Sequence, residues 1–163
     1  KMAATLKGNT WFVEKLSPKE QEVVTVTPEI KHNVLITGCQ NVVVKVEAKC
    51  TKITLDASSK SAVICKDLVS SVEVVNCKKV QVQADGTLPQ AQLDKSSGVT
   101  LFLQSPASRG VAIFTAQCSE VNVIVPGEGE NADPKEHAVA EQFESKFVNG
   151  KLVTEPVAHV SAS

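Results

Sequence analysis

Pairs of apolar residues return about every 19 positions between Val34 and Val125. One pair gives two neighbouring columns: Val34, Ile53, Val72, Ala91 and Val111, then Ile36, Leu55, Val74, Leu93 and Ile113. Half a repeat away a second pair runs in step: Val44, Val63, Val82, Leu101 and Val121, then Val46, Cys65, Ala84, Leu103 and Val123. A fixed period of this length predicts a stacked-repeat architecture.

The spacing inside each repeat predicts strands. Apolar residues at i and i+2 are typical of a strand with one buried face, and no helical pattern lies between them. The simplest arrangement stacks each strand in parallel on its equivalent one repeat later, which is a parallel β-helix. Trp11 and Val13 predict a first strand, and Val24 and Val26 extend the second pair of columns downward. The sequence therefore predicts an all-β fold of about six coils, with Trp11 sealing the lowest one.

The character of the chain changes after Val125. Residues 126–135 are rich in Gly, Pro and acidic residues and predict a loop. Asn149-Gly150 then separates two β-prone runs, which predicts a hairpin. We therefore expect one domain made of a β-helix (1–126), a connection (127–142) and a hairpin with a tail (143–163).

An isolated hairpin is marginal in water, and the ends of a β-helix expose strand edges that need cover. Packing of the hairpin on its own stack would meet both needs, and so would packing on the stack of a second copy. The long connection makes an exchanged hairpin and a homodimer reachable.

Composition excludes several classes. A net charge of -1 and a single Arg, Arg109, argue against nucleic acid as a partner. No run approaches a membrane span, so no membrane insertion is expected. Lys1 to Lys7 lacks the apolar stretch of a secretion signal, and we expect a cytoplasmic protein. The five cysteines have no CxxC spacing and are interpreted as reduced thiols, with no metal or cofactor expected.

Five stretches of the chain carry a resemblance to a known family: GNTWFVEKL (8–16), the run from Cys50 to Gly98, CSEVNVIVP (118–126), VAEQF (139–143) and VNGKLVTE (148–155). In this order they resemble the C-terminal domain of adenylyl cyclase-associated proteins, which bind actin monomers. The residues after Thr154, Glu155-Pro156-Val157 and onward, depart from the usual short tail of the family.

The resemblance implies a right-handed parallel β-helix of six coils that dimerises by exchange of the C-terminal hairpin. It also implies binding of ADP-actin monomers, promotion of their nucleotide exchange, and a place in the actin cytoskeleton. It further implies either a short form of the kind found in some protists or the C-terminal part of a longer protein. The dimerisation residues would be Phe143, Phe147, Val148, Asn149, Gly150, Leu152 and Val153.

No enzyme motif is present, since GxSxG, HExxH and a phosphate loop are all missing from the sequence. The flat outward faces and stacked turns favour protein binding. Candidate actin-binding residues are Lys52, Lys66, Asp67, Glu73, Asn76, Lys78, Lys79, Gln81, Gln83, Asp94 and Lys95.

Two alternatives to an actin-binding role remain open. One is a GTPase activator like tubulin-folding cofactor C, which resembles this fold and inserts an Arg into its partner; only Arg109 could serve. The other is a purely structural dimerisation module. Only an exchange assay separates the latter from the main hypothesis.

Overall fold

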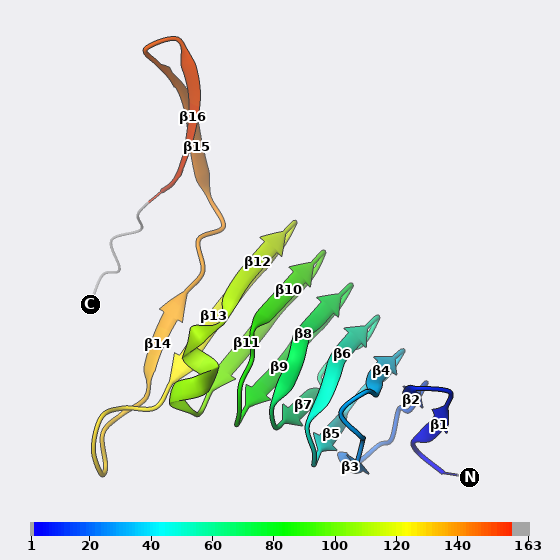
Figure 1. Cartoon of the computed structure of the whole chain (residues 1–163). Coiled ribbons are helices and arrows are strands. Elements are labelled where there is room, and N and C mark those ends of the chain that lie inside the picture. The colour runs from blue at the N-terminus through cyan, green and yellow to red at the C-terminus, as the bar shows by residue number, and fades with distance from the viewer. Residues whose placement is uncertain (1, 158–163) are drawn as a thin grey trace.

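Two parallel stacks of strands form the body of the protein (Figure 1). The computed structural model describes residues 2–157, so residues 158–163 of the predicted tail lie outside it. In spatial order, sheet A contains β1 (Thr5–Lys7), β2 (Thr10–Glu14), β4 (Asn33–Thr37), β6 (Cys50–Asp56), β8 (Leu68–Val75), β10 (Gln90–Asp94) and β12 (Ala112–Ala116). Sheet B contains β14 (Lys135–Ala138), β13 (Ser119–Val125), β11 (Ser97–Leu103), β9 (Lys78–Ala84), β7 (Ala62–Cys65), β5 (Val42–Val46) and β3 (Glu22–Val26).

The chain alternates between the two sheets, so each coil gives one strand to each. Strands of neighbouring coils pair in parallel, from β2 to β12 in sheet A and from β3 to β13 in sheet B. A separate antiparallel hairpin follows, made of β15 (Phe143–Val148) and β16 (Lys151–Pro156). The predicted parallel β-helix with a C-terminal hairpin is confirmed.

The interior columns stack largely as the period predicts. Val44 pairs with Val63 and Val63 with Val82, while Ile36 pairs with Leu55 in the other sheet. These side chains are all buried. Val24 pairs with Val44 and Val26 with Val46, which confirms that these residues extend the columns of sheet B into the first coil.

The last coil does not follow the predicted register. Ala91 pairs with Ile113 instead of Val111, and Leu101 pairs with Val123 instead of Val121. The cause is the connection between β11 and β12, which holds a short 3-10 helix (η1, Pro106–Gly110) absent from the corresponding turns below. These extra residues lengthen the last repeat, so every later residue shifts by two positions from our expectation.

The predicted connection, residues 127–142, contains one strand, β14. β14 pairs antiparallel with β13 and covers the upper edge of sheet B. β1 covers the lower edge of sheet A in the same way, by antiparallel pairing with β2. Both additions hide backbone groups that would otherwise be open to edge-to-edge association.

The turn from sheet A to sheet B has the same shape in successive coils. We call these turns the A-to-B corner, formed by residues 38–41, 57–60, 76–79, 95–98 and 117–120. Each turn begins and ends with a residue of positive φ, as at Asn76 (53°) and Lys79 (54°). The conformation costs an L residue about 1 kcal/mol. Backbone bonds to the next coil offset that cost, such as Asn76 N–H to the Asp94 carbonyl at 3.1 Å.

The side chain at the second position of each corner turn points inward. Going up the stack these residues alternate between thiol and hydroxyl: Cys39, Ser58, Cys77, Ser96 and Cys118. The Ser58 hydroxyl accepts the N–H of Cys39 at 3.1 Å, and the Ser96 hydroxyl accepts that of Cys77 at 3.1 Å. The small polar residues therefore satisfy buried backbone donors where the chain turns.

All five cysteines are free, and four of them are buried. Burial raises the pKa of the Cys50 thiol to about 11 and that of Cys65 to about 12. It also raises the pKa of Cys39 and Cys77, against backbone hydrogen bonds that lower it. Since thiolate is the reactive form, these four thiols are inert in the folded protein at neutral pH.

We expect a disulfide-exchange reagent at pH 8 to modify about one thiol per folded chain and all five in denaturant. The fast reaction belongs to half-buried Cys118, and Cys118→Ser should remove it, whereas Cys39→Ser should leave it. Rapid labelling of two or more thiols in the folded protein would contradict the buried positions.

Trp11 lies at the bottom of the stack, where it packs half-buried against the core. Its indole N–H donates to Nδ1 of buried His32 at 3.2 Å, and the two rings meet edge to face. The predicted sealing of the lowest coil by Trp11 agrees with this position.

Candidate functional site: a basic corner and an unpartnered hairpin

The A-to-B corner brings several predicted site residues together. Asn76, Lys78 and Lys79 occupy one turn, and Lys95 lies at the turn above. Cys77 occupies the inward position of its turn, which leaves Asn76, Lys78 and Lys79 exposed on the outside. Asp94 ends β10 just before Lys95 and is half-buried, with its carbonyl accepting the Asn76 N–H.

The corner also carries a lysine that the sequence analysis missed. Lys60 lies one coil below Lys79, because Ser59 and Lys78 form a parallel bridge directly before them. The signal was available, since Lys60 and Lys79 differ by one 19-residue period. We define the basic corner as Lys60, Lys78, Lys79 and Lys95.

No ion pair neutralises the charges of the basic corner within the described part of the chain. Among residues 2–157 the ion pairs are His32–Glu29, Lys52–Glu73 and Lys146–Glu144, and none of them involves the basic corner. Shallow hollows separate the lysines, one of 370 Å³ beside Lys78 and Lys95 and one of 180 Å³ between Lys60 and Lys79. The corner therefore presents spaced, unpaired positive charge on a rigid backbone, which suits an acidic protein surface.

The remaining predicted residues lie elsewhere on the coils. Lys52 and Glu73 pair with each other at 3.8 Å on the outer face of sheet A. Gln81 and Gln83 lie on sheet B, and the Gln83 amide donates to Asp85 at 3.0 Å. Gln81 lines the hollow between Lys60 and Lys79, whereas Lys52, Glu73 and Gln83 lie farther along their strands and do not belong to the basic corner.

Lys66 and Asp67 lie on the opposite corner, where sheet B returns to sheet A. Asp67 Oδ1 accepts the Thr87 N–H at 2.7 Å, so this side chain supports the turn of the next coil. Gly86 lies against the same carboxyl, where a Cβ would collide with it. Asp67 thus has a structural role that sequence alone did not reveal.

The hairpin has two chemically different faces. Because β15 and β16 pair directly, Phe147 opposes Leu152 and Ser145 opposes Thr154. Residues directly opposite share a face of the ladder. One face therefore holds Phe143, Ser145, Phe147, Leu152, Thr154 and Pro156, and the other holds Glu144, Lys146, Val148, Lys151, Val153 and Glu155.

The apolar face of the hairpin is exposed in the described structure. Phe147 is 77% exposed, Leu152 62% and Phe143 56%. The hairpin projects away from the stack, and within residues 2–157 its strands pair only with each other (Figure 1). Large apolar side chains grouped in this way mark an interaction surface.

A second open surface lies at the top of sheet A. β12 pairs with β10 on one side, and no strand in the described part of the chain pairs with its other side. Its side chains are mostly exposed, with Phe114 at 53%. The stack thus leaves an unpaired edge near the end from which the hairpin departs.

Other chemistry finds little support in the described residues. Arg109 is exposed in the last turn of η1. Residues 2–157 contain no cluster of three His, Cys, Asp or Glu side chains able to hold a metal ion. In the same residues, no helix has the length and apolar character needed to cross a membrane.

Comparisons with known proteins agree on one family. The family model described as adenylate cyclase associated (CAP) C terminal matches residues 1–159. The chain is 36% identical to the adenylyl cyclase-associated protein of Dictyostelium discoideum and 37% identical to cyclase-associated protein 1 of Arabidopsis thaliana, over 95% of its own length in both cases. It spans about a third of each relative, 33% and 32%.

A solved structure shares the fold over nearly the whole chain. The crystal structure of cyclase-associated protein from Cryptosporidium parvum matches with a TM-score of 0.85 and 30% sequence identity. The match covers 94% of this chain and 94% of the other. The coils and the hairpin therefore form an architecture that this related protein shares.

Proposed function

Since the chain belongs to the family of cyclase-associated protein C-terminal domains, we propose that it binds actin monomers and promotes exchange of their nucleotide. ADP-actin is the preferred form, and the setting is the cytoplasmic actin cytoskeleton. The protein acts by binding and makes or breaks no bond itself. The observation that carries the proposal is the basic corner, whose lysines are exposed and have no ion pair within residues 2–157.

The rigid stack explains how binding could change the partner. The three corner turns that carry these lysines are tied to the coils above and below by backbone hydrogen bonds, so the lysines keep a fixed spacing. If a rigid surface fits one conformation of actin better than another, binding increases the population of the better-fitting conformation. Faster nucleotide release requires this surface to favour the open nucleotide cleft, because equal affinity for both conformations would shift nothing.

A homodimer completes the proposal. In the part of the chain that the structure describes, the apolar hairpin face is exposed and the β12 edge has no neighbouring strand. Placing the hairpin of each copy against the upper coil of the other would cover both surfaces through one symmetric interface. The dimer would then present two basic corners on one rigid body.

We expect the double substitution Lys78→Ala with Lys79→Ala to reduce the stimulation of nucleotide release about tenfold, because two interface charges are lost. The measurement is release of a fluorescent nucleotide from ADP-actin monomers, repeated with ATP-actin. Both side chains are exposed, so the thermal unfolding midpoint should stay within about 2 °C.

The matched control replaces two exposed lysines on the opposite corner, Lys31→Ala with Lys49→Ala. It removes the same charge and should leave exchange unchanged. Equal losses in both double variants would show that net charge matters and the basic corner does not. No effect of the intact chain on nucleotide release would refute the proposed function.

A further inference from the structure

The top of the β-helix poses a hydrogen-bonding problem at Glu120. In two of the coils below, the last residue of the A-to-B corner turn donates its N–H to the coil above. Asn41 N–H reaches the Ser59 carbonyl at 3.4 Å, and Lys60 N–H reaches the Lys78 carbonyl at 3.1 Å. Glu120 occupies the same corner position in the top coil, with the same positive φ of 53°. Among residues 2–157 no coil lies above Glu120, so no backbone carbonyl of a further coil accepts its N–H.

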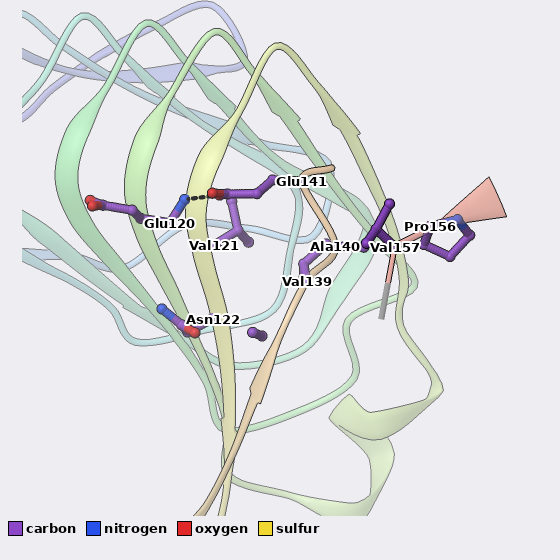
Figure 2. Close-up of a pocket in the computed structure, with 9 residues that line it drawn as sticks. Glu120, Val121, Asn122, Val139, Ala140, Glu141, Pro156 and Val157 are labelled. Atoms are coloured by element: carbon purple, nitrogen blue, oxygen red, sulfur yellow. Dashed lines mark hydrogen bonds between the residues drawn. The ribbon is translucent and has the colours of Figure 1, made fainter. Parts of the chain in front are cut away.

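A side chain from further along the chain takes the place of that carbonyl. Oε2 of Glu141 accepts the Glu120 N–H at 2.7 Å, as Figure 2 shows. The bond is shorter than the equivalent bonds in the coils below, as expected where the acceptor is a charged carboxylate. The Glu141 carboxylate thus takes the place of the backbone acceptor that a further coil would provide.

Glu141 lies where the chain leaves the stack. Two residues earlier, the Val139 N–H donates to the Val121 carbonyl at 2.9 Å. This backbone bond attaches the chain to the stack directly after β14. One residue later, the Gln142 carbonyl accepts Val157 N–H at 2.9 Å and closes the foot of the hairpin. The Glu141 contact therefore lies between the stack and the hairpin.

Packing does little to fix the direction of the hairpin at this point. A pocket of 510 Å³ separates the top coil from the hairpin foot (Figure 2). Val121 and Val139 line it from the stack side, and Pro156 and Val157 line it from the hairpin side. With this space unfilled, the orientation of the hairpin depends on a few hydrogen bonds.

We propose that Glu141 is a positioning residue, whose carboxylate replaces the missing coil at Glu120 and fixes the direction in which the hairpin leaves the stack. Its effect is to hold the apolar face of the hairpin away from its own coils, where a second copy can receive it. The inference rests on the proposed dimer. It adds the contact that controls how readily the dimer forms.

The test compares Glu141→Ala with Glu141→Gln and with the control Glu136→Ala, which removes an exposed carboxylate from β14. Sedimentation equilibrium measures the dimer dissociation constant, and NMR hydrogen exchange measures protection of the Glu120 amide. We expect Glu141→Ala to raise the dissociation constant about tenfold and to speed Glu120 amide exchange about tenfold. Glu141→Gln keeps an acceptor without the charge and should fall between wild type and Glu141→Ala.

The outcomes separate this inference from the proposed dimer. A dimeric wild type with an unchanged dissociation constant in Glu141→Ala would overturn the inference and leave the dimer intact. A wild type that stays monomeric would overturn the proposed dimer. It would also overturn the role of Glu141 in positioning the hairpin for that dimer. Equal effects of Glu136→Ala and Glu141→Ala would overturn the specific contact, because only Glu141 bonds to Glu120.

Discussion

Phe147→Asp should raise the dissociation constant of the proposed dimer by about 100-fold or more, because it places a carboxylate at the centre of the apolar hairpin face. Aromatic anchors of this kind contribute about 2–4 kcal/mol to an interface. Phe147 is 77% exposed in the single chain, so the substitution removes no intramolecular core contact. Sedimentation equilibrium measures the dissociation constant, and urea unfolding should show an unchanged stack.

The hairpin provides its own matched control. Lys146→Asp also introduces a carboxylate one residue away from Phe147, but on the charged face, opposite Val153. We expect a small effect there, since that face has ionic side chains to present to water. Equal weakening by both substitutions would show that the interface uses both faces. A dimer that tolerates Phe147→Asp would place the interface elsewhere.

Leu55→Ala should lower the free energy of unfolding by about 2–5 kcal/mol, as expected for a fully buried leucine. Leu55 has no solvent exposure and lies between Ile36 and Val74 in its column. Coils contact only their neighbours, so surrounding side chains have little freedom to fill the space. Urea denaturation followed by circular dichroism measures the loss.

Thr54→Ala tests the register on the same strand. Thr54 points to the outer face of sheet A, where it is half-buried. Its removal should change the free energy of unfolding by less than about 1 kcal/mol. If Thr54→Ala cost more than Leu55→Ala, the strand would have its inner and outer faces exchanged, since a shift of one residue reverses every side chain.

Much of the fold was predictable because the 19-residue period acts through local geometry. Residues one period apart, such as Val44 and Val63, stack wherever each turn has the same length. The Asn149-Gly150 pair predicted the hairpin for a similar reason, since both residues adopt the positive φ that a two-residue turn requires. These features depend on neighbours in the chain or on a constant repeat.

The register of the last coil was not predictable in this way. Between β11 and β12 the repeat lengthens to accommodate η1, and in sheet B an apolar pair was available at either register. Val121 and Val123 fit the expected register, whereas Val123 and Val125 fit the observed one, in which Leu101 pairs with Val123. Where two alignments satisfy the alternation equally, only the path of the turn decides between them.

The candidate site shows the same division. The sequence placed Asn76, Lys78 and Lys79 in an exposed turn, but it grouped them with Lys66 and Asp67, which lie on the opposite corner. It also missed Lys60, although the period connects Lys60 to Lys79. Their assembly into one charged surface depends on which corner each turn occupies, and that follows from how the coils stack.

The sequence by itself determined the coil, its apolar columns and the hairpin, because each follows from a repeated spacing or a local backbone preference. Only the tertiary structure decided how the stack ends. The open β12 edge, the exposed Phe147 and the contact between Glu141 and Glu120 exist because no further coil follows β13 within residues 2–157. A repeat specifies how each coil meets the next one, and at the last coil that partner has to come from elsewhere.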